Sequence, residues 1–266
     1  MTPHSWTRYV AIGDSFTEGM CDPLPEPSTG FVGWADRLAA HLAGVAAEAG
    51  VDFGYANLAV RGRKLGDVVG PQLDAALAMA PDLVSMVGGG NDILRPSVDL
   101  DAIADRLEAA VVRIRATGAA VLLATPTDPA KAGLFKALRP RHAVHTANLF
   151  SIAARHGCAI IDIWGLDALQ DWRMWADDRI HLTSEGHRRV ALAAQAALGF
   201  DTDRADWATP LPPADPAGRR EALSSHLHWG RKHLGPWVDR RLHGRSSGDA
   251  VTAKRPTLER VSEPRA

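Results

Sequence analysis

The sequence predicts an α/β protein in which helices cover both faces of a parallel β-sheet. Strand-like and helical segments alternate up to about residue 199. The strand-like segments are apolar at successive positions, which is typical of strands that are buried on both faces. The 266 residues are 46% hydrophobic and 23% charged, a composition and length that suit a globular protein with a sizeable core.

Five short apolar segments provide the expected strands. Each contains several apolar, β-branched or aromatic residues, and glycine, proline or polar residues lie at or near its end. A helical segment separates each strand from the next, which favours parallel pairing because parallel strands need a long crossover connection. The expected strands are RYVAIGD (8–14), DFGYANLAV (52–60), PDLVSMVGGG (81–90), AAVLLATPT (119–127) and CAIIDIW (158–164).

The intervening segments are expected to be helices. Their apolar residues recur every three or four positions, so these residues share one helix face. The clearest case is VDLDAIADRLEAAVVRIRATG, and Gly70-Pro71 marks a break or a new first turn inside another. The expected helices span residues 31–50, 65–80, 98–118, 142–157 and 183–199.

The composition changes near residue 200. Residues 201–220 are rich in Asp and Pro and are typical of a linker. Two short basic amphipathic helices are expected over 221–234 and 236–244, and the polar end, 245–266, is expected to be mobile. The sequence therefore predicts one domain over residues 1–200 and an extension over residues 201–266.

Charge and cysteine content argue against several classes of protein. The net charge of −1 gives no argument for nucleic-acid binding, and none is expected. The N-terminus lacks the apolar region of a signal peptide, and no apolar run approaches a membrane span, so we expect a cytoplasmic protein. Cys21 and Cys158 cannot make a disulfide framework and lack metal-ligand spacing. We expect neither a metal nor a cofactor.

Polar residues with catalytic chemistry follow four of the expected strands. Gly13-Asp14-Ser15 ends the first strand, Gly62 follows the second, and Asn91-Asp92 follows the third. Asp178 and His181 come after the fifth strand. The carboxyl ends of parallel strands lie along one edge of a sheet. We therefore expect a hydroxyl, backbone amides, a side-chain amide, a carboxylate and an imidazole to meet in one crevice.

These groups are the ones that acyl transfer requires. A serine hydroxyl is a weak nucleophile until a base takes its proton, and His181 can serve as the base for Ser15. Asp178, three residues before His181, can orient the imidazole. The backbone amides of Ser15 and Gly62 and the side chain of Asn91 are candidate donors of an oxyanion hole. The sequence therefore predicts a Ser-His-Asp hydrolase that cleaves small-molecule esters through an acyl-enzyme.

The same four segments resemble the four blocks of the SGNH, or GDSL, hydrolase family of serine esterases and lipases. GDSFTEG resembles the first block, NLAVRG the second, GGGND the third and DDRIHLT the last, and the order and spacing also fit. The resemblance covers residues 8–199. It implies a three-layer α/β/α, flavodoxin-like fold with five parallel strands in the order 2-1-3-4-5, and hydrolysis of carboxylic esters or thioesters without a metal. The family often has Gly where this chain has Arg179, so we expect Arg179 to border the substrate pocket.

Several neighbouring residues have two interpretations. Asp14 and Asp92 are expected to support the turn and Asn91 rather than to act as acids. Trp172 and Trp175 precede the Asp-His segment, and they either pack in the core or form a wall of the substrate pocket.

The substrate also has more than one interpretation. A thioesterase, a lysophospholipase or an O-acetyl transferase would use the same residues. A binding protein without catalysis is an alternative of another class, because residues 219–245 carry seven Lys or Arg against two acidic residues, with His and Trp between them. This segment either docks on the domain or makes a weak contact with an anionic membrane. The acyl chain length, the alcohol and the oligomeric state are open at this point.

Overall fold

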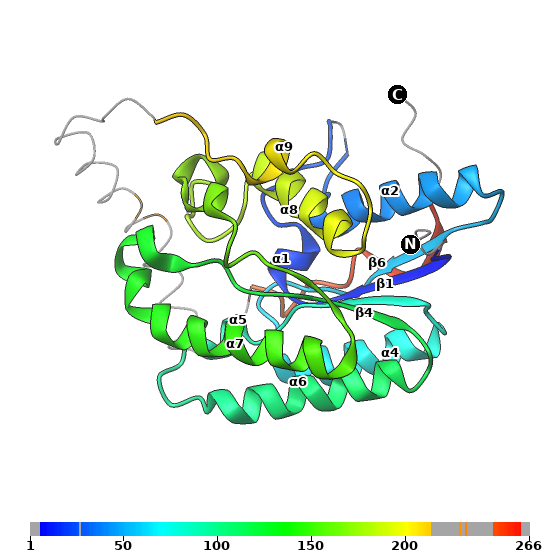
Figure 1. The fold of residues 1–266 in the computed structure, drawn as a ribbon, viewed down its shortest axis with the longest axis horizontal. Helices are drawn as coiled ribbons and strands as arrows, with labels where there is room; N and C mark the ends of the chain where they lie inside the picture. The colour runs from blue at the N-terminus through cyan, green and yellow to red at the C-terminus, as the bar shows by residue number, and fades with distance from the viewer. Residues whose placement is uncertain (1–5, 27, 214–228, 230–231, 233–246, 262–266) are drawn as a thin grey trace.

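The computed structural model describes residues 6–26, 28–213, 229, 232 and 247–261. One sheet has the strand order β5-β4-β3-β1-β2-β6 (Figure 1). Strands β1 to β5 pair in parallel and β6 is antiparallel to β2. The order 2-1-3-4-5 is therefore confirmed, with a sixth strand beside the expected five. The strands are β1 Arg8–Ile12, β2 Gly54–Asn57, β3 Leu83–Met86, β4 Ala120–Ala124, β5 Ala159–Ile161 and β6 Arg255–Arg260.

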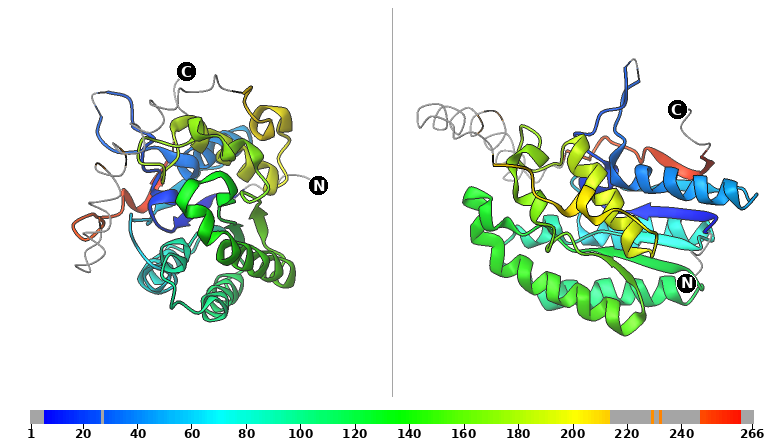
Figure 2. Two further views of the ribbon diagram at one scale, coloured as in Figure 1. Left: turned by 90° about the vertical axis from the view of Figure 1, so that its left-hand side faces the viewer. Right: turned by 45° about the horizontal axis from the view of Figure 1, so that its top comes forward.

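Helices cover both faces of this sheet (Figures 1 and 2). Helices α2 (Gly33–Glu48) and α8 (Ser184–Ala197) lie on one face. Helices α4 (Leu73–Ala78), α6 (Leu100–Arg115) and α7 (Arg139–His156) lie on the other. The shorter helices are α1 Ser15–Glu18, α3 Leu65–Asp67, α5 Gly90–Ile93 and α9 Arg204–Ala208; single turns are η1 Val68–Gln72, η2 Pro129–Lys131, η3 Gly133–Leu138, η4 Asp167–Gln170 and η5 Trp172–Met174. The break expected at Gly70-Pro71 is present as a kink at Gly70 between α3 and α4.

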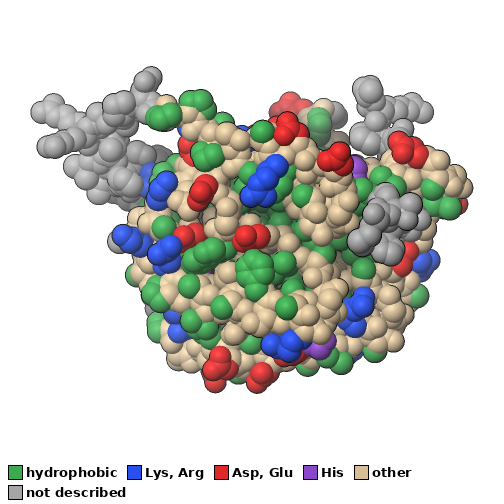
Figure 3. Space-filling view, viewed as in Figure 1, with side chains coloured by type: hydrophobic (Ala, Val, Ile, Leu, Met, Phe, Trp, Pro, Cys, Tyr) green, Lys and Arg blue, Asp and Glu red, His purple; other side chains and the backbone are tan. Residues whose placement is uncertain are grey.

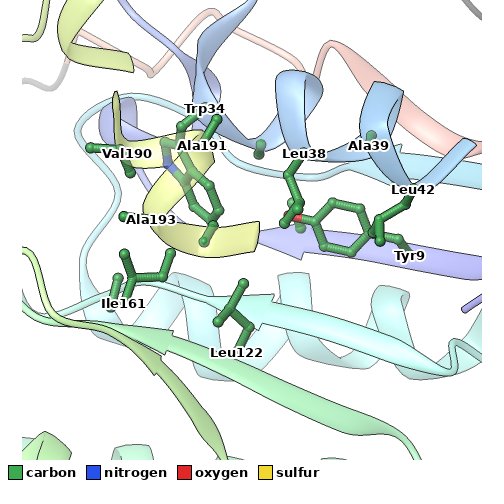
Figure 4. Packing of buried hydrophobic residues seen from close by; sticks show 14 of the residues in the cluster. Tyr9, Trp34, Leu38, Ala39, Leu42, Leu122, Ile161, Val190, Ala191 and Ala193 are labelled. Carbon is green, nitrogen blue, oxygen red and sulfur yellow. The ribbon is translucent and has the colours of Figure 1, made fainter. Parts of the chain in front are cut away.

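Alternate residues of each central strand enter different halves of the core. In β1, Tyr9 and Ala11 pack with α2 and α8, whereas Val10 and Ile12 pack on the opposite face. Figure 4 shows the half of the core on the α2 and α8 side, where Tyr9 lies beside Leu38 and Leu42 of α2. Because both faces are covered, successive strand residues are buried, which explains the continuous apolar runs in the sequence.

The polar C-terminal end contains a strand, so the prediction of a mobile end was wrong for residues 255–260. Strand β6 pairs with β2 with Gly54 opposite Arg260 and Asn57 opposite Arg255. Leu258 packs against the core on the face of Val10 and Ile12, while Pro256, Thr257, Glu259 and Arg260 are exposed. An edge strand needs few apolar residues, and the sequence therefore gives only a weak signal for it.

The expected linker also contains a helix, α9. Asp203 caps it by accepting a hydrogen bond from the backbone N–H of Ala205 at 2.9 Å. Trp207 is 7% exposed, and Asp206 pairs with Arg188 of α8 at 2.8 Å. Residues 204–208 thus pack on the domain, and the prediction of a linker was wrong there because one buried Trp is enough to dock a short helix.

Most of residues 219–245, with the two predicted basic helices, lie outside the described residues. The domain boundary near residue 200, the helices and a membrane contact therefore stay predictions. No helix in the described part of the chain is long and apolar enough to cross a membrane. On the face in Figure 3, Lys and Arg side chains lie among Asp and Glu side chains.

Candidate active site

The turn after β1 places Ser15 at the first position of α1. Asp14 caps this helix, and its carboxylate accepts a hydrogen bond from the backbone N–H of Phe16 at 3.1 Å. A Cβ atom on Gly13 would lie 2.9 Å from the carbonyl oxygen of Val87, so a side chain at this position would collide with the residue that follows β3. Each residue of the Gly-Asp-Ser sequence therefore has a structural reason. Gly13 allows close packing, Asp14 caps α1, and Ser15 lies at the sheet edge.

A short loop before α8 holds Asp178 and His181 together. Nδ1 of His181 lies 2.6 Å from Oδ2 of Asp178. The other carboxylate oxygen of Asp178 accepts the backbone N–H groups of Ile180 and His181, each at 3.0 Å. The loop is closed by a hydrogen bond from Ala176 N–H to the carbonyl oxygen of His181 at 2.8 Å. The sequence spacing of three residues thus gives one preformed carboxylate–imidazole pair.

The pair shifts the pKa of both members. Burial raises the pKa of Asp178, but the bonds from His181 and Ile180 outweigh burial and hold this pKa at about 2. Burial lowers the pKa of His181, but the bond to Asp178 and the nearby Cys21 outweigh it and raise this pKa to about 9. Asp178 therefore stabilises the protonated imidazole, which is the form that His181 takes when it accepts a proton.

The turns after β2 and β3 bring Gly62 and Asn91 to the same edge. Gly62 has φ +72°, in the left-handed region that glycine adopts without strain. The side-chain amide of Asn91 donates to the carbonyl oxygen of Arg63 at 2.9 Å and to Oδ2 of Asp14 at 3.2 Å. Asn91 therefore connects the turn that contains Gly62 with the turn that contains Ser15.

Two carboxylates support these turns. Oδ2 of Asp92 accepts the backbone N–H of Leu65 at 2.9 Å, which ties α5 to the loop after Gly62. Asp14 is 8% exposed, and burial raises its pKa to about 6 against the opposing effects of the Phe16 N–H and the His181 charge.

One cavity of about 480 Å³ brings the predicted site residues together. Ser15, Gly62, Asn91, Asp178 and His181 all line it. Arg179, which was expected to border the pocket, also lines it, and so do Trp172 and Trp175, for which core packing was the alternative. Trp175 in addition donates its indole N–H to the carbonyl oxygen of Leu169 at 2.7 Å.

The backbone of Arg179 has φ +58°, a conformation that favours glycine. The Arg179 guanidinium lies over two indole rings, 5.5 Å from the centre of Trp172 and 5.2 Å from that of Trp229. Trp229 also donates its indole N–H to the carbonyl oxygen of Asp178 at 2.9 Å. At the position where the family often has glycine, this chain therefore has Arg179, and its side chain packs against two indole rings at the edge of the cavity.

Sequence reasoning missed the contacts of Cys21 and Trp229 with the Asp-His loop. Sγ of Cys21 lies 3.8 Å from Oδ2 of Asp178. In the described part of the chain, Cys21, Asp178 and His181 are the only group of three or more His, Cys, Asp or Glu residues with ligand atoms close enough for a metal ion, all within 4.8 Å of one another. Both missed residues are distant in sequence from Asp178, and no local pattern indicates such contacts.

Comparisons with known proteins identify a matching family and solved structures with a similar fold. The model of the GDSL-like Lipase/Acylhydrolase family matches residues 11–189. LAE5, an alpha/beta hydrolase enzyme from the metagenome of Lake Arreo, Spain, is 27% identical over 73% of this chain and 95% of its own, with a TM-score of 0.61. No curated protein matches the chain in sequence.

Two further solved structures share the fold at lower identity. Axe2, an acetylxylan esterase from Geobacillus stearothermophilus, is 22% identical over 76% of this chain and 98% of its own, with a TM-score of 0.61. TesA is 24% identical over 72% of this chain and 97% of its own, with a TM-score of 0.56.

Proposed function

Because this chain belongs to the GDSL-like lipase/acylhydrolase family, we propose that it is a serine hydrolase that cleaves carboxylic esters through an acyl-enzyme. The observation that carries the proposal is the 2.6 Å contact between His181 and Asp178, in the cavity that Ser15 also lines. A nucleophile, a base and a group that orients the base are the groups that a Ser-His-Asp hydrolase uses for this chemistry.

In the proposed reaction, Oγ of Ser15 attacks the ester carbonyl carbon while Nε2 of His181 takes the hydroxyl proton. Asp178 holds Nδ1 of His181 and stabilises the imidazolium that forms. The tetrahedral intermediate collapses, the bond to the alcohol oxygen breaks, and His181 returns its proton to the leaving alcohol. Water then attacks the acyl group on Ser15 by the same route, with His181 again as base and then acid.

The negative oxygen of the tetrahedral intermediate requires fixed donors. The backbone N–H groups of Ser15 and Gly62 and the side-chain amide of Asn91 are the proposed ones, because all three residues line the cavity. The Asn91 contact to Asp14 is the longer of its two hydrogen bonds, at 3.2 Å against 2.9 Å. We expect the developing oxyanion to replace Asp14 as the acceptor.

The cavity favours an ester with an apolar group. Its walls are largely apolar, and its volume of about 480 Å³ suits a small ligand. The apolar wall residues include Leu94, Pro129, Phe135, Leu138, Leu169 and Ile180.

A second candidate, hydrolysis of an ester that also carries an anionic group, rests on the charges in the same cavity. Lys131, Arg179 and Lys232 line it. Two carboxylates also line it: Asp128, which pairs with Arg139 at 2.8 Å, and Asp178, which contacts His181. An apolar chain next to a negative head group, as in a lysophospholipid, would match both features.

Turnover of p-nitrophenyl acetate, butyrate and octanoate, with fluorophosphonate labelling, tests the proposal. We expect the wild-type protein to turn over at least one ester and to label at Ser15, and Ser15→Ala to lose both. Ser247→Ala is the matched control, because Ser247 lines the same cavity and the variant should still label. Turnover by Ser15→Ala close to the wild-type rate would refute the assignment.

Two further substrates separate the substrate classes. A lysophospholipid tests the anionic candidate, and an acetylated xylo-oligosaccharide tests the kind of ester named for Axe2. Preference for the lysophospholipid over the neutral esters would favour the second candidate.

A further inference from the structure

The side chain of Lys254, just before β6, is inserted between α1 and the first turn of α2. Its ammonium group donates to the carbonyl oxygen of Glu18 at 2.7 Å and to that of Val32 at 2.5 Å. It also donates to the carbonyl oxygen of Phe31 at 3.1 Å and to Oδ2 of Asp36 at 2.5 Å. The Lys254 side chain is 20% exposed, so this cation is largely removed from water and surrounded by oxygen atoms.

Glu18 connects Lys254 with the turns that hold two of the three proposed oxyanion donors, the backbone amides of Ser15 and Gly62. It is the last residue of α1, the short helix that begins at Ser15. Its carboxylate accepts the backbone N–H of Arg61 at 2.6 Å and also binds the Arg61 guanidinium. Arg61 directly precedes Gly62. A shift of Glu18 would therefore move the amides of Ser15 and Gly62 relative to each other.

A second contact brings the backbone at Gly248 against the turn at Arg61-Gly62. A Cβ atom on Gly248 would lie 2.0 Å from the carbonyl oxygen of Arg61, so the backbone can approach this closely only at glycine. The preceding residue, Ser247, lines the cavity. Pairing of β6 with β2 fixes the other end of the segment.

We propose that residues 248–254 act as a positioning element of the active site, with Lys254 as the residue that sets α1 against the turn at Arg61-Gly62. This inference rests on the proposed function, and it assigns a positioning role to a segment that lies outside the family match at residues 11–189. The amides of Ser15 and Gly62 must converge on one oxygen atom, and a misplacement of about 1 Å can lower a rate roughly 100-fold.

Two variants that break the same ion pair distinguish a role of Lys254 in positioning the site from a role in the stability of the fold alone. Lys254→Met and Asp36→Asn both remove the Lys254–Asp36 charge pair, but only Lys254→Met removes the bonds to the carbonyls of Glu18, Phe31 and Val32. With both proteins folded by circular dichroism, we expect Lys254→Met to lower kcat about 10- to 100-fold with KM within about threefold. Asp36→Asn should lower kcat less than about threefold.

Gly248→Ala gives an independent test that keeps Lys254 and its partners. The new Cβ would push the segment away from Arg61, so kcat should again fall with little change in KM. Arg260→Met is the control on β6, because the exposed Arg260–Asp52 pair is far from these contacts in the strand, and its kcat should equal the wild-type value.

Equal kcat values for Lys254→Met and Asp36→Asn would overturn the inference, and so would a change in KM alone. These failures differ from a failure of the proposed function, which would appear as no ester turnover and no fluorophosphonate labelling in the wild-type protein. In that case the inference falls together with the function on which it rests.

Discussion

Oδ2 of Asp178 lies 2.6 Å from Nδ1 of His181, and the same carboxylate accepts the backbone N–H of His181 through its other oxygen. These two bonds fix both the position and the rotation of the imidazole. Since Nδ1 is occupied by Asp178, Nε2 is the nitrogen left to exchange a proton with Ser15 in the proposed reaction.

The pH dependence of activity should report this pair. His181 must be neutral to act as a base, and its pKa is raised to about 9 in the folded protein. We therefore expect kcat/KM to rise with pH through about 9. Asp178→Asn removes the charge that raises this pKa, so the rise should move to lower pH, and the plateau should fall at least about 100-fold. An unchanged pH profile in Asp178→Asn would contradict the role given to Asp178.

The role of Asn91 can be separated from substrate binding by steady-state kinetics. An oxyanion exists in the transition state and not in the bound ester, so Asn91→Ala should lower kcat about 100- to 1000-fold with little change in KM. Asp92→Asn is the neighbouring control, because its amide oxygen can still accept the Leu65 N–H, and its loss should be below about tenfold. A higher KM with unchanged kcat in Asn91→Ala would show that Asn91 recognises the substrate instead.

The sequence was sufficient for the central sheet and for the convergence of the site residues. Strands such as β1 are buried on both faces, so they are apolar at successive positions. The helices around them have apolar residues only every three or four positions, so the two patterns differ in the sequence. Ser15 and His181 are far apart in the chain, yet each follows a strand of one parallel sheet. Topology therefore predicts that they meet, even though no local pattern connects them.

The features that the sequence did not predict depend on single long-range contacts. Strand β6 joins the sheet with Leu258 as its residue packed on the core. The Lys254 bonds to Glu18 span 236 residues, and the Cys21 contact with Asp178 spans 157. A lone lysine or cysteine in a polar segment has the same local sequence whether or not it has such a partner.

The backbone of Arg179 predicts an unusual order of stability for two variants. Arg179→Gly and Arg179→Ala both lose the packing on Trp172 and Trp229. Only glycine adopts φ +58° without strain, so the Gly variant should be more stable than the Ala variant by about 1 kcal/mol. Urea unfolding of the two proteins measures this difference. An Ala variant of equal or greater stability would show that the loop relaxes out of the left-handed conformation.

Modification of Cys21 should inactivate the protein, because the Cys21 thiol lies 3.8 Å from the carboxylate that orients His181. A methylthio group, added with methyl methanethiosulfonate, would occupy space beside this carboxylate and disturb its contact with the imidazole. We expect at least about a tenfold loss of kcat/KM, since small displacements of catalytic groups have large effects on rate. The loss should be reversed by dithiothreitol, which removes the added group.

Cys158 provides the matched control for this reaction. It is also half-buried, and burial raises the pKa of its thiol, which lowers the reactivity of this thiol. Cys21→Ser should therefore resist inactivation, whereas Cys158→Ser should be inactivated as fast as the wild-type protein. The same rate of inactivation in Cys21→Ser as in the wild type would mean that the sensitive group is not beside Asp178, and the contact between Cys21 and the Asp-His pair would then have no consequence for the reaction.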